Sequence, residues 1–307
     1  MTAHRWVIGR GLLGSAITRT RETEPFRADI PWHEPDAAAR ALRDALGTFL
    51  SETDGPADIY WCAGRGVTST PVHELDAEVA VFASFLGALE KMPAEQRERV
   101  GVFLASSVGG AYAGSVNPPF TESTPAIPLS AYGTAKLQME SLLYEATGRG
   151  RWRALVGRIT NLYGPGQTPG KGQGLISAVV RSFVTEQPVS IFVPLDTLRD
   201  YIYEDDCAEM IAAGMQRLRG EEAGTTVTKI ISGTNAVSIS AILAEHTRLR
   251  RRRSPIILGG TGGAGQARDL RVRSEVWPDL SRYARTTLSE GLDAVFRNQL
   301  AAWSIRQ

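Results

Sequence analysis

The residues best suited to chemistry are a tyrosine and a lysine four positions apart, Tyr132 and Lys136, with a serine upstream at Ser107. Residues at i and i+4 of a helix lie on one face. A phenol has a pKa of about 10, so exchanging a proton near neutral pH requires a fall of about 3 units, or roughly 4 kcal/mol. A neighbouring ammonium group contributes to that fall because it stabilises the phenolate. We therefore predict that Tyr132 transfers a proton, that Lys136 lowers its pKa, and that the Ser107 hydroxyl holds a substrate oxygen.

Ser107 follows one of several short apolar runs that alternate with helix-like segments. Apolar residues recur at helical spacing between the runs, and such alternation is typical of βαβ units in a parallel sheet. The sequence therefore predicts an α/β fold, a doubly wound parallel sheet of the Rossmann type. In such sheets the binding sites lie at strand ends, where Ser107 stands. The predicted strands are 7–8, 58–64, 99–105 and 153–159, and the predicted helices include 75–89 and 135–146.

A glycine-rich turn follows the first predicted strand and opens an apolar helix. It fits the pattern G-x-G-x-x-G, in which glycines permit a tight turn and the close approach of a pyrophosphate to the helix N-terminus. The turn predicts a dinucleotide site made of Gly9, Arg10, Gly11, Leu12, Leu13 and Gly14. A second glycine-rich stretch, 259–265, is not followed by an apolar helix and is interpreted as a loop.

Two residues near this turn bear on the choice between NAD and NADP. An acidic side chain for the ribose 2′-hydroxyl is expected about 20 positions after the motif begins, where Asp29 stands. No clear strand leads into Asp29, and the segment from Gly14 to the strand at 58–64 is short for this arrangement. Arg10 is equally able to pair with a 2′-phosphate. The choice between NAD and NADP therefore stays open, and Arg10 favours NADP.

The composition of the chain changes near residue 164, and glycine and proline recur from there up to residue 174. Such a stretch predicts a loop. A helix at 175–186, a strand at 189–193 and a helix from about 205 are expected beyond it. We predict a dinucleotide-binding domain at 1–165 and a smaller, mainly substrate-binding lobe at 166–307, interleaved with the sheet domain near 188–220.

Composition narrows the classes of function. The formal net charge is +1, with 43% hydrophobic residues, 2 cysteines and 4 histidines. The small net charge argues against recruitment of nucleic acid or of an anionic membrane. The few cysteines and scattered histidines argue against a disulfide framework or a metal site. Neither a long apolar stretch nor a signal peptide is found, so a cytoplasmic, metal-free protein is expected. The five arginines within 248–253 are interpreted as a solvated helix end.

Two further motifs complete a resemblance that covers nearly the whole chain. Residues 158–166 read R-I-T-N-L-Y-G-P-G, and residues 199–206 read R-D-Y-I-Y-E-D-D. Together with the glycine turn and Tyr132/Lys136, they are similar to the extended short-chain dehydrogenase/reductases. The group resembled is the NAD-dependent epimerase/dehydratase family acting on nucleotide sugars. The chain departs from this pattern at Ile8, which replaces the first glycine of the family.

The resemblance implies roles for several residues. Asn161 would lie against the sugar or the first phosphate of the substrate. Arg199 and, less directly, Arg268 would pair with its diphosphate, because a guanidinium suits phosphate oxygens. Ala63 and Gly64 would let the backbone approach the cofactor ribose. Lys136 would hold the ribose beside Tyr132.

The resemblance does not choose the reaction. Dehydratases of the family carry an acidic pair directly after the catalytic hydroxyl residue, whereas Val108 and two glycines follow Ser107 here. The stretch from Ser107 to Tyr112 also looks one residue longer than usual, which keeps Ser106 as a substitute for Ser107. A 4-ketoreductase and a C4 epimerase with tightly bound NAD are nearly balanced, and the short cofactor segment favours the reductase.

Two hypotheses from outside this reaction class are retained. One is a nicotinamide-binding regulator without catalysis, and the other is an oxidoreductase for a ketone that is not a sugar. The amphipathic helices at about 75–90 and 130–147 could pair across a two-fold axis, as in dimers of the family. A homodimer is therefore expected.

Overall fold

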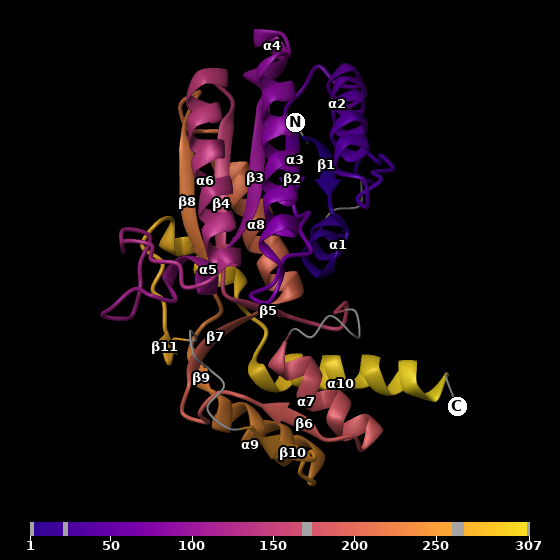
Figure 1. Cartoon of the computed structure of the whole chain (residues 1–307), viewed down its shortest axis with the longest axis vertical. Helices are drawn as coiled ribbons and strands as arrows, with labels where there is room; N and C mark the ends of the chain where they lie inside the picture. Colours follow the sequence, from indigo (N-terminus) through magenta and orange to yellow (C-terminus); the bar gives the residue numbers. More distant parts are fainter. Residues whose placement is uncertain (1–2, 21–23, 168–173, 260–266, 306–307) are drawn as a thin grey trace.

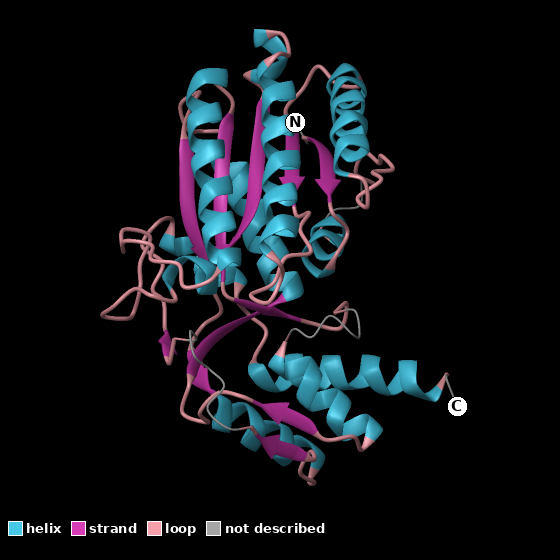
Figure 2. Ribbon diagram, viewed as in Figure 1, coloured by secondary structure: helices cyan, strands magenta, loops and turns pink. Residues whose placement is uncertain are grey.

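The computed structural model describes residues 3–20, 24–167, 174–259 and 267–305. The described chain forms two units that are stacked along the long axis (Figure 1). The larger unit is a parallel sheet between layers of helices, and the smaller unit combines helices with short strands (Figure 2). The site lies where the strands of the larger unit end, toward the smaller one.

The larger unit has a five-stranded sheet in the order β1-β2-β3-β4-β8. Every neighbouring pair in it is parallel. The predicted doubly wound α/β fold is therefore confirmed. The strands are β1 (His4–Ile8), β2 (Ala57–Trp61), β3 (Val100–Ser107), β4 (Arg153–Ile159) and β8 (Thr226–Ile231).

Alternation along the strands divides the core into two layers, because successive side chains of a strand point to opposite faces. Trp6 and Ile8 pack in a cluster with α2 (Pro35–Ser51), α3 (Val72–Glu90) and α6 (Ala131–Gly150). Val7 packs in a second cluster with α1 (Leu12–Arg19) and α8 (Glu204–Leu218). The sheet is thus covered on both faces, as parallel sheets require.

The sheet ends at β1, with little structure beyond it. Among the described residues, only an isolated bridge between Trp6 and Phe26 extends the sheet on that side. The chain then passes through a segment without regular structure and enters α2. The short spacing from Gly14 to β2 therefore reflects a reduced first half of the sheet.

The smaller unit contains two short sheets. One pairs β5 (Asn161–Tyr163), β7 (Leu198–Tyr203), β9 (Ala236–Ser238) and β11 (Asp269–Leu270), and the other pairs β6 (Val189–Ile191) with β10 (Ile256–Leu258). The helices of this unit are α7 (Leu175–Thr185), α9 (Ile239–Arg250) and α10 (Leu288–Ser304). The remaining short helices are α4 (Ala94–Arg97), α5 (Val108–Tyr112) and η1 (Pro278–Tyr283).

The chain crosses between the units more than once. After β7 it returns to the larger unit, where α8 covers one face of the sheet and β8 forms its edge. By contrast, β6, within the predicted interleaved stretch 188–220, pairs in the smaller unit. The domain division at 165 stays a prediction. Most of the second glycine-rich stretch, 259–265, lies outside the described residues.

The arginine-rich segment 248–253 ends α9 as expected, but it is not solvated throughout, because the Arg250 side chain is only 15% exposed. The helix runs to Arg250, and Arg251 caps it in a left-handed conformation. Arg248 pairs with Glu245, Arg250 with Asp293 and Arg252 with Glu186.

His246 on α9 gives a pH-dependent stability. It is 1% exposed, and burial, followed by the charge of Arg250, lowers its pKa from 6.5 to about 4. Below pH 6.5 the unfolded chain gains a proton that the folded chain takes up only near pH 4. The free energy of unfolding should therefore fall by up to about 3 kcal/mol between these values. Urea unfolding at pH 7 and pH 4.5 should show a weaker pH dependence in His246→Gln. An equal dependence in both proteins would contradict the assignment.

Candidate active site

Ser107 and Tyr132 meet where a helix begins beside the end of β3. The Ser130 side chain caps α6 by accepting a hydrogen bond from the Gly133 N–H (3.1 Å). A Cβ placed on Gly110 would lie 3.3 Å from the Ser107 Cβ and 3.4 Å from the Tyr132 Cε1. The two side chains are therefore neighbours, and the absence of a side chain at Gly110 allows this approach.

Lys136 completes the group on the same face of α6. Its Nζ lies 5.8 Å from the centre of the Tyr132 ring and donates to the Ala105 carbonyl oxygen at 3.3 Å. The structure thus brings together the serine, the tyrosine and the lysine identified from the sequence.

The structure distinguishes Ser106 from Ser107. Ser106 is buried, and its hydroxyl donates to the Glu140 carboxylate (2.5 Å). Ser107 accepts a hydrogen bond from the Gly110 N–H (3.1 Å) and lies beside Tyr132. The Ser106 hydroxyl is thus engaged by Glu140, whereas Ser107 is the serine that lies beside Tyr132.

A buried ion pair behind the group was not found from the sequence. The Arg158 guanidinium contacts both Glu140 oxygens, with Nη2 2.7 Å from Oε2. Arg158 also donates to the Tyr112 hydroxyl (2.6 Å), which donates to the Thr121 carbonyl (2.9 Å). Burial alone would lower the pKa of Arg158, but Glu140 outweighs it and the pKa lies above its usual value. The pair ties α6 to β4 one helical turn beyond Lys136.

A cavity of about 750 Å³ adjoins the glycine-rich turn and the end of β2. Gly9 has φ +88°, and a Cβ at Gly14 would collide with the Gly9 carbonyl oxygen. Gly11, the N-cap of α1, carries no side chain to block the helix N-terminus. These features fit an elongated dinucleotide whose pyrophosphate lies at that N-terminus. The cavity is lined in part by Gly9, Arg10, Gly11, Cys62, Ala63 and Gly64.

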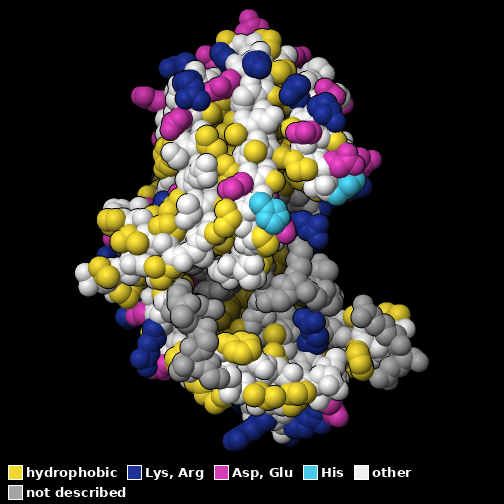
Figure 3. Space-filling model, in the orientation of Figure 1, with side chains coloured by type: hydrophobic (Ala, Val, Ile, Leu, Met, Phe, Trp, Pro, Cys, Tyr) yellow, Lys and Arg dark blue, Asp and Glu magenta, His cyan; other side chains and the backbone are white. Residues whose placement is uncertain are grey.

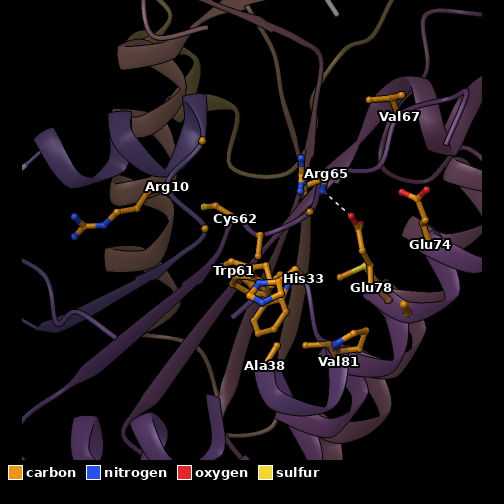
Figure 4. A pocket seen from close by; sticks show the side chains of 18 residues that line it. Arg10, His33, Ala38, Trp61, Cys62, Arg65, Val67, Glu74, Glu78 and Val81 are labelled. Carbon is orange, nitrogen blue, oxygen red and sulfur yellow. Dashed lines mark hydrogen bonds between the residues drawn. The ribbon is translucent and has the colours of Figure 1, made fainter. Parts of the chain in front are cut away.

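Several lining residues were not identified from the sequence. Trp32, in the segment before α2, lines the cavity. His33 lines it from the same segment, Arg65 from the loop after β2 and Glu78 from α3 (Figure 4). Arg65 directly follows Gly64, and this adjacency in the sequence could have indicated Arg65 as a lining residue. No periodicity marks Glu78, and the segment at Trp32 has no regular structure.

Asp29 is exposed and is not among the residues that line the cavity. The expected strand before it is reduced to the bridge at Phe26. The role of Asp29 at a ribose hydroxyl stays a prediction, whereas Arg10 does line the cavity.

The predicted substrate residues other than Ser107 lie in the smaller unit. The Asn161 side chain donates to the Asp200 carbonyl at 2.8 Å. The Arg199 guanidinium donates to the carbonyls of Leu198 (2.8 Å) and Ala267 (2.6 Å), and burial lowers its pKa. Arg268 is on the adjacent chain segment, with its exposed side chain paired to Asp196.

Residues 7–228 match the NAD dependent epimerase/dehydratase family. This chain belongs to that family. It is a family of enzymes, and the resemblance found from the sequence is confirmed.

Relatives within the epimerase/dehydratase family include both reductases and epimerases. The dTDP-4-dehydro-6-deoxyglucose reductase of Escherichia coli is 29% identical over 115 residues, which are 38% of this chain and 36% of the relative. The UDP-glucose 4-epimerase of Azospirillum brasilense is 25% identical over 263 residues, or 77% of this chain and 73% of the relative. The matched region of the reductase is thus little more than a third of its length.

Solved structures of the same fold cover nearly the whole chain. MoeE5 in complex with UDP-glucuronic acid and NAD aligns with a TM-score of 0.75 at 22% identity, covering 95% of this chain and 97% of MoeE5. RMD from Pseudomonas aeruginosa complexed with NADPH aligns with a TM-score of 0.76 at 19% identity, covering 98% and 100%. At these identities the likeness establishes the fold.

Two absences apply to the described part of the chain. None of its helices combines the length and apolar character needed to cross a bilayer. Nor do three His, Cys, Asp or Glu side chains gather there as metal ligands would.

Proposed function

We propose that this family member is a 4-ketoreductase, which transfers a hydride between NADP(H) and a sugar carbon, C4, of a nucleotide-diphosphate sugar. The observation that carries the proposal is the grouping of Ser107, Tyr132 and Lys136 beside the cavity at the glycine-rich turn. Ketone reduction needs a proton donor and a hydride donor at one carbonyl. The side chains supply the first, and a bound nicotinamide supplies the second.

Each of the three side chains has a separate task in this proposal. Tyr132 gives a proton to the carbonyl oxygen during reduction or takes it during oxidation. Ser107 donates a hydrogen bond to the same oxygen and holds it beside the phenol. Lys136 favours the phenolate that remains after the proton has left.

The glycine-rich turn would bind the cofactor pyrophosphate, with the ribose near Ala63, Gly64 and Lys136. The substrate diphosphate would lie near Arg199 and Arg268. In the structure the Arg199 guanidinium donates to carbonyl groups, and phosphate oxygens would accept these hydrogen bonds more strongly because they are charged. Asn161, on the strand next to Arg199, would face the sugar or the first phosphate.

The three residues after Ser107 disfavour a dehydratase. Elimination of water from the sugar needs an acid and a base in addition to the tyrosine. Ser107 is the N-cap of α5, and the first three residues of this helix are Val108, Gly109 and Gly110. None of these three residues can donate or accept the additional proton.

Arg10 supports NADP(H) as the cofactor. Its side chain is exposed at the cavity, and it forms no ion pair with a described residue. Arg10→Ser should raise the Kd for NADPH by about tenfold and leave the Kd for NADH within about twofold, because only NADPH carries the 2′-phosphate. Fluorescence titration measures both, with Arg27→Ser as control, since exposed Arg27 pairs with Glu24 instead. Equal loss of both cofactors would contradict the preference.

The alternative within this class is a C4 epimerase, which the relative from Azospirillum brasilense favours. An epimerase returns its hydride to the same sugar, so the cofactor is regenerated in each cycle. The purified protein should be heat-denatured and the released nucleotide identified by mass spectrometry. A reductase should release little NAD and should oxidise added NADPH with a 4-keto nucleotide sugar. Retained NAD near one per chain would favour the epimerase.

A homodimer is part of the same proposal. Helices α3 and α6 pack side by side, and the face over them carries few charges away from its upper end (Figure 3). Ala80, Ala83, Ser84 and Gly87 give α3 small side chains there, and Tyr144 of α6 is 43% exposed. Two copies could pack these helices closely across a two-fold axis.

A further inference from the structure

Glu78 stands at the cavity wall with its two carboxylate oxygens in different surroundings. Oε1 accepts hydrogen bonds from the backbone N–H groups of Arg65 (2.6 Å) and Gly66 (3.0 Å). Figure 4 shows the side chain reaching from α3 to this loop. Oε1 therefore holds the loop after β2, and Oε2 is left for another partner.

Oε2 faces the open side of Gly64. A Cβ placed on Gly64 would lie 3.3 Å from the Glu78 Oε2 and 3.5 Å from the Lys136 Nζ. Because both atoms lie within 3.5 Å of this point, the Glu78 Oε2 and the Lys136 Nζ are at most about 7 Å apart. They nevertheless form no ion pair in the described part of the chain, so a space remains between a carboxylate oxygen and an ammonium. Gly64, at φ +146°, keeps that space free of a side chain.

A hydroxyl group is the ligand that suits such a space. It donates one hydrogen bond and accepts others, and hydrogen bonds of about 2.8 Å on either side span up to roughly 5.6 Å. Glu78 can only accept when ionised, and Lys136 can only donate. A neutral hydroxyl satisfies both, whereas a phosphate oxygen would be repelled by the carboxylate.

We propose that Glu78 and Lys136 form a clamp for a ribose hydroxyl on the nicotinamide half of the cofactor. This inference rests on the proposed function only in assigning the cavity to a nicotinamide dinucleotide. Glu78 then has two roles: Oε1 orders the loop, and Oε2 fixes the ribose whose other contact is Lys136. The clamp orients the nicotinamide toward Tyr132 through the ribose.

The carboxylate also lies close to Tyr132. The Tyr132 Cδ2 lies 3.5 Å from a Cβ placed on Gly66, and the Glu78 Oε2 lies 3.3 Å from the same point. The other charged or titratable groups around Glu78 in the cavity are Arg10, His33, Cys62, Arg65 and Glu74.

The test compares two cofactor ligands in one variant. Glu78→Gln keeps an oxygen for the Arg65 and Gly66 amides but places an NH₂ group opposite Lys136. We expect the Kd for NADPH to rise about tenfold. The Kd for 2′,5′-ADP, which lacks the nicotinamide ribose, should stay within about twofold. Asp76→Asn is the matched control, because Asp76 is exposed on α3 outside the cavity lining.

If Glu78→Gln fails to fold, Glu78→Asp retains the charge with a shorter reach, and the same ligand pair applies.

The outcomes separate the clamp from the proposed reaction. Selective loss of NADPH over 2′,5′-ADP supports the clamp even if no nucleotide sugar is turned over, a result that would refute the ketoreductase alone. Equal loss of both ligands would show that Glu78 acts only through the loop. Unchanged binding of both would also overturn the clamp.

Discussion

Tyr132→Phe is expected to lower kcat by about 10²- to 10⁴-fold, the range in which a positioned acid–base group contributes. The substitution removes only the hydroxyl, so the packing of the ring against Gly66 and Gly110 is retained. The Kd for NADPH should therefore change less than about threefold. Steady-state oxidation of NADPH with a 4-keto nucleotide sugar measures the first effect, and fluorescence titration the second.

The control for this variant is on the same helix. The exposed Tyr144 hydroxyl lies 2.5 Å from the Thr228 hydroxyl, far along α6 from the site. Tyr144→Phe should keep normal kcat. Turnover by Tyr132→Phe at the rate of the unaltered protein would refute its role as the proton donor.

Arg158→Met should lower the free energy of unfolding by about 3–5 kcal/mol, because it leaves the buried Glu140 without its ionic partner. The Glu140 side chain is only 4% exposed and that of Arg158 is 11% exposed. Solvent can therefore do little to replace the lost contact. Urea unfolding followed by circular dichroism measures the change.

Replacing both partners should be milder than replacing one. In Arg158→Met/Glu140→Leu no charge is left buried, so most of the lost stability should return. Arg149→Met is the surface control, since Arg149 pairs with Glu90 and is 62% exposed. Arg149→Met should lower the free energy of unfolding by less than about 1 kcal/mol. Additive losses in the double variant would show that the pair is not coupled.

Periodicity explains why much of the fold was predictable. The apolar runs at β1, β2, β3 and β4 alternate with helices, and the glycine-rich turn follows β1 as predicted. Tyr132 and Lys136 were found because both lie on one helix face. These features depend on local spacing, which a sequence displays directly.

The residues that the sequence analysis did not find are defined by contacts between segments that are distant in the sequence. Glu140 meets Arg158 across a helix–strand boundary, and Glu78 meets Gly64 and Lys136 only when three segments fold together. The choice between Ser106 and Ser107 likewise required the register of β3 against α6. For Asp29, the spacing rule assumes a second strand, which this chain reduces to one bridge.

The return of the chain through α8 and β8 has a consequence for biosynthesis. Residues 1–165 alone would lack β8 beside β4 and would leave Val7, Tyr60 and Phe103 without their partners on α8. Parallel pairing between segments so distant in sequence forms slowly. During synthesis on the ribosome, the five-stranded sheet can be completed only after residue 231 has emerged. Until then, one apolar face is available to chaperones or to aggregation.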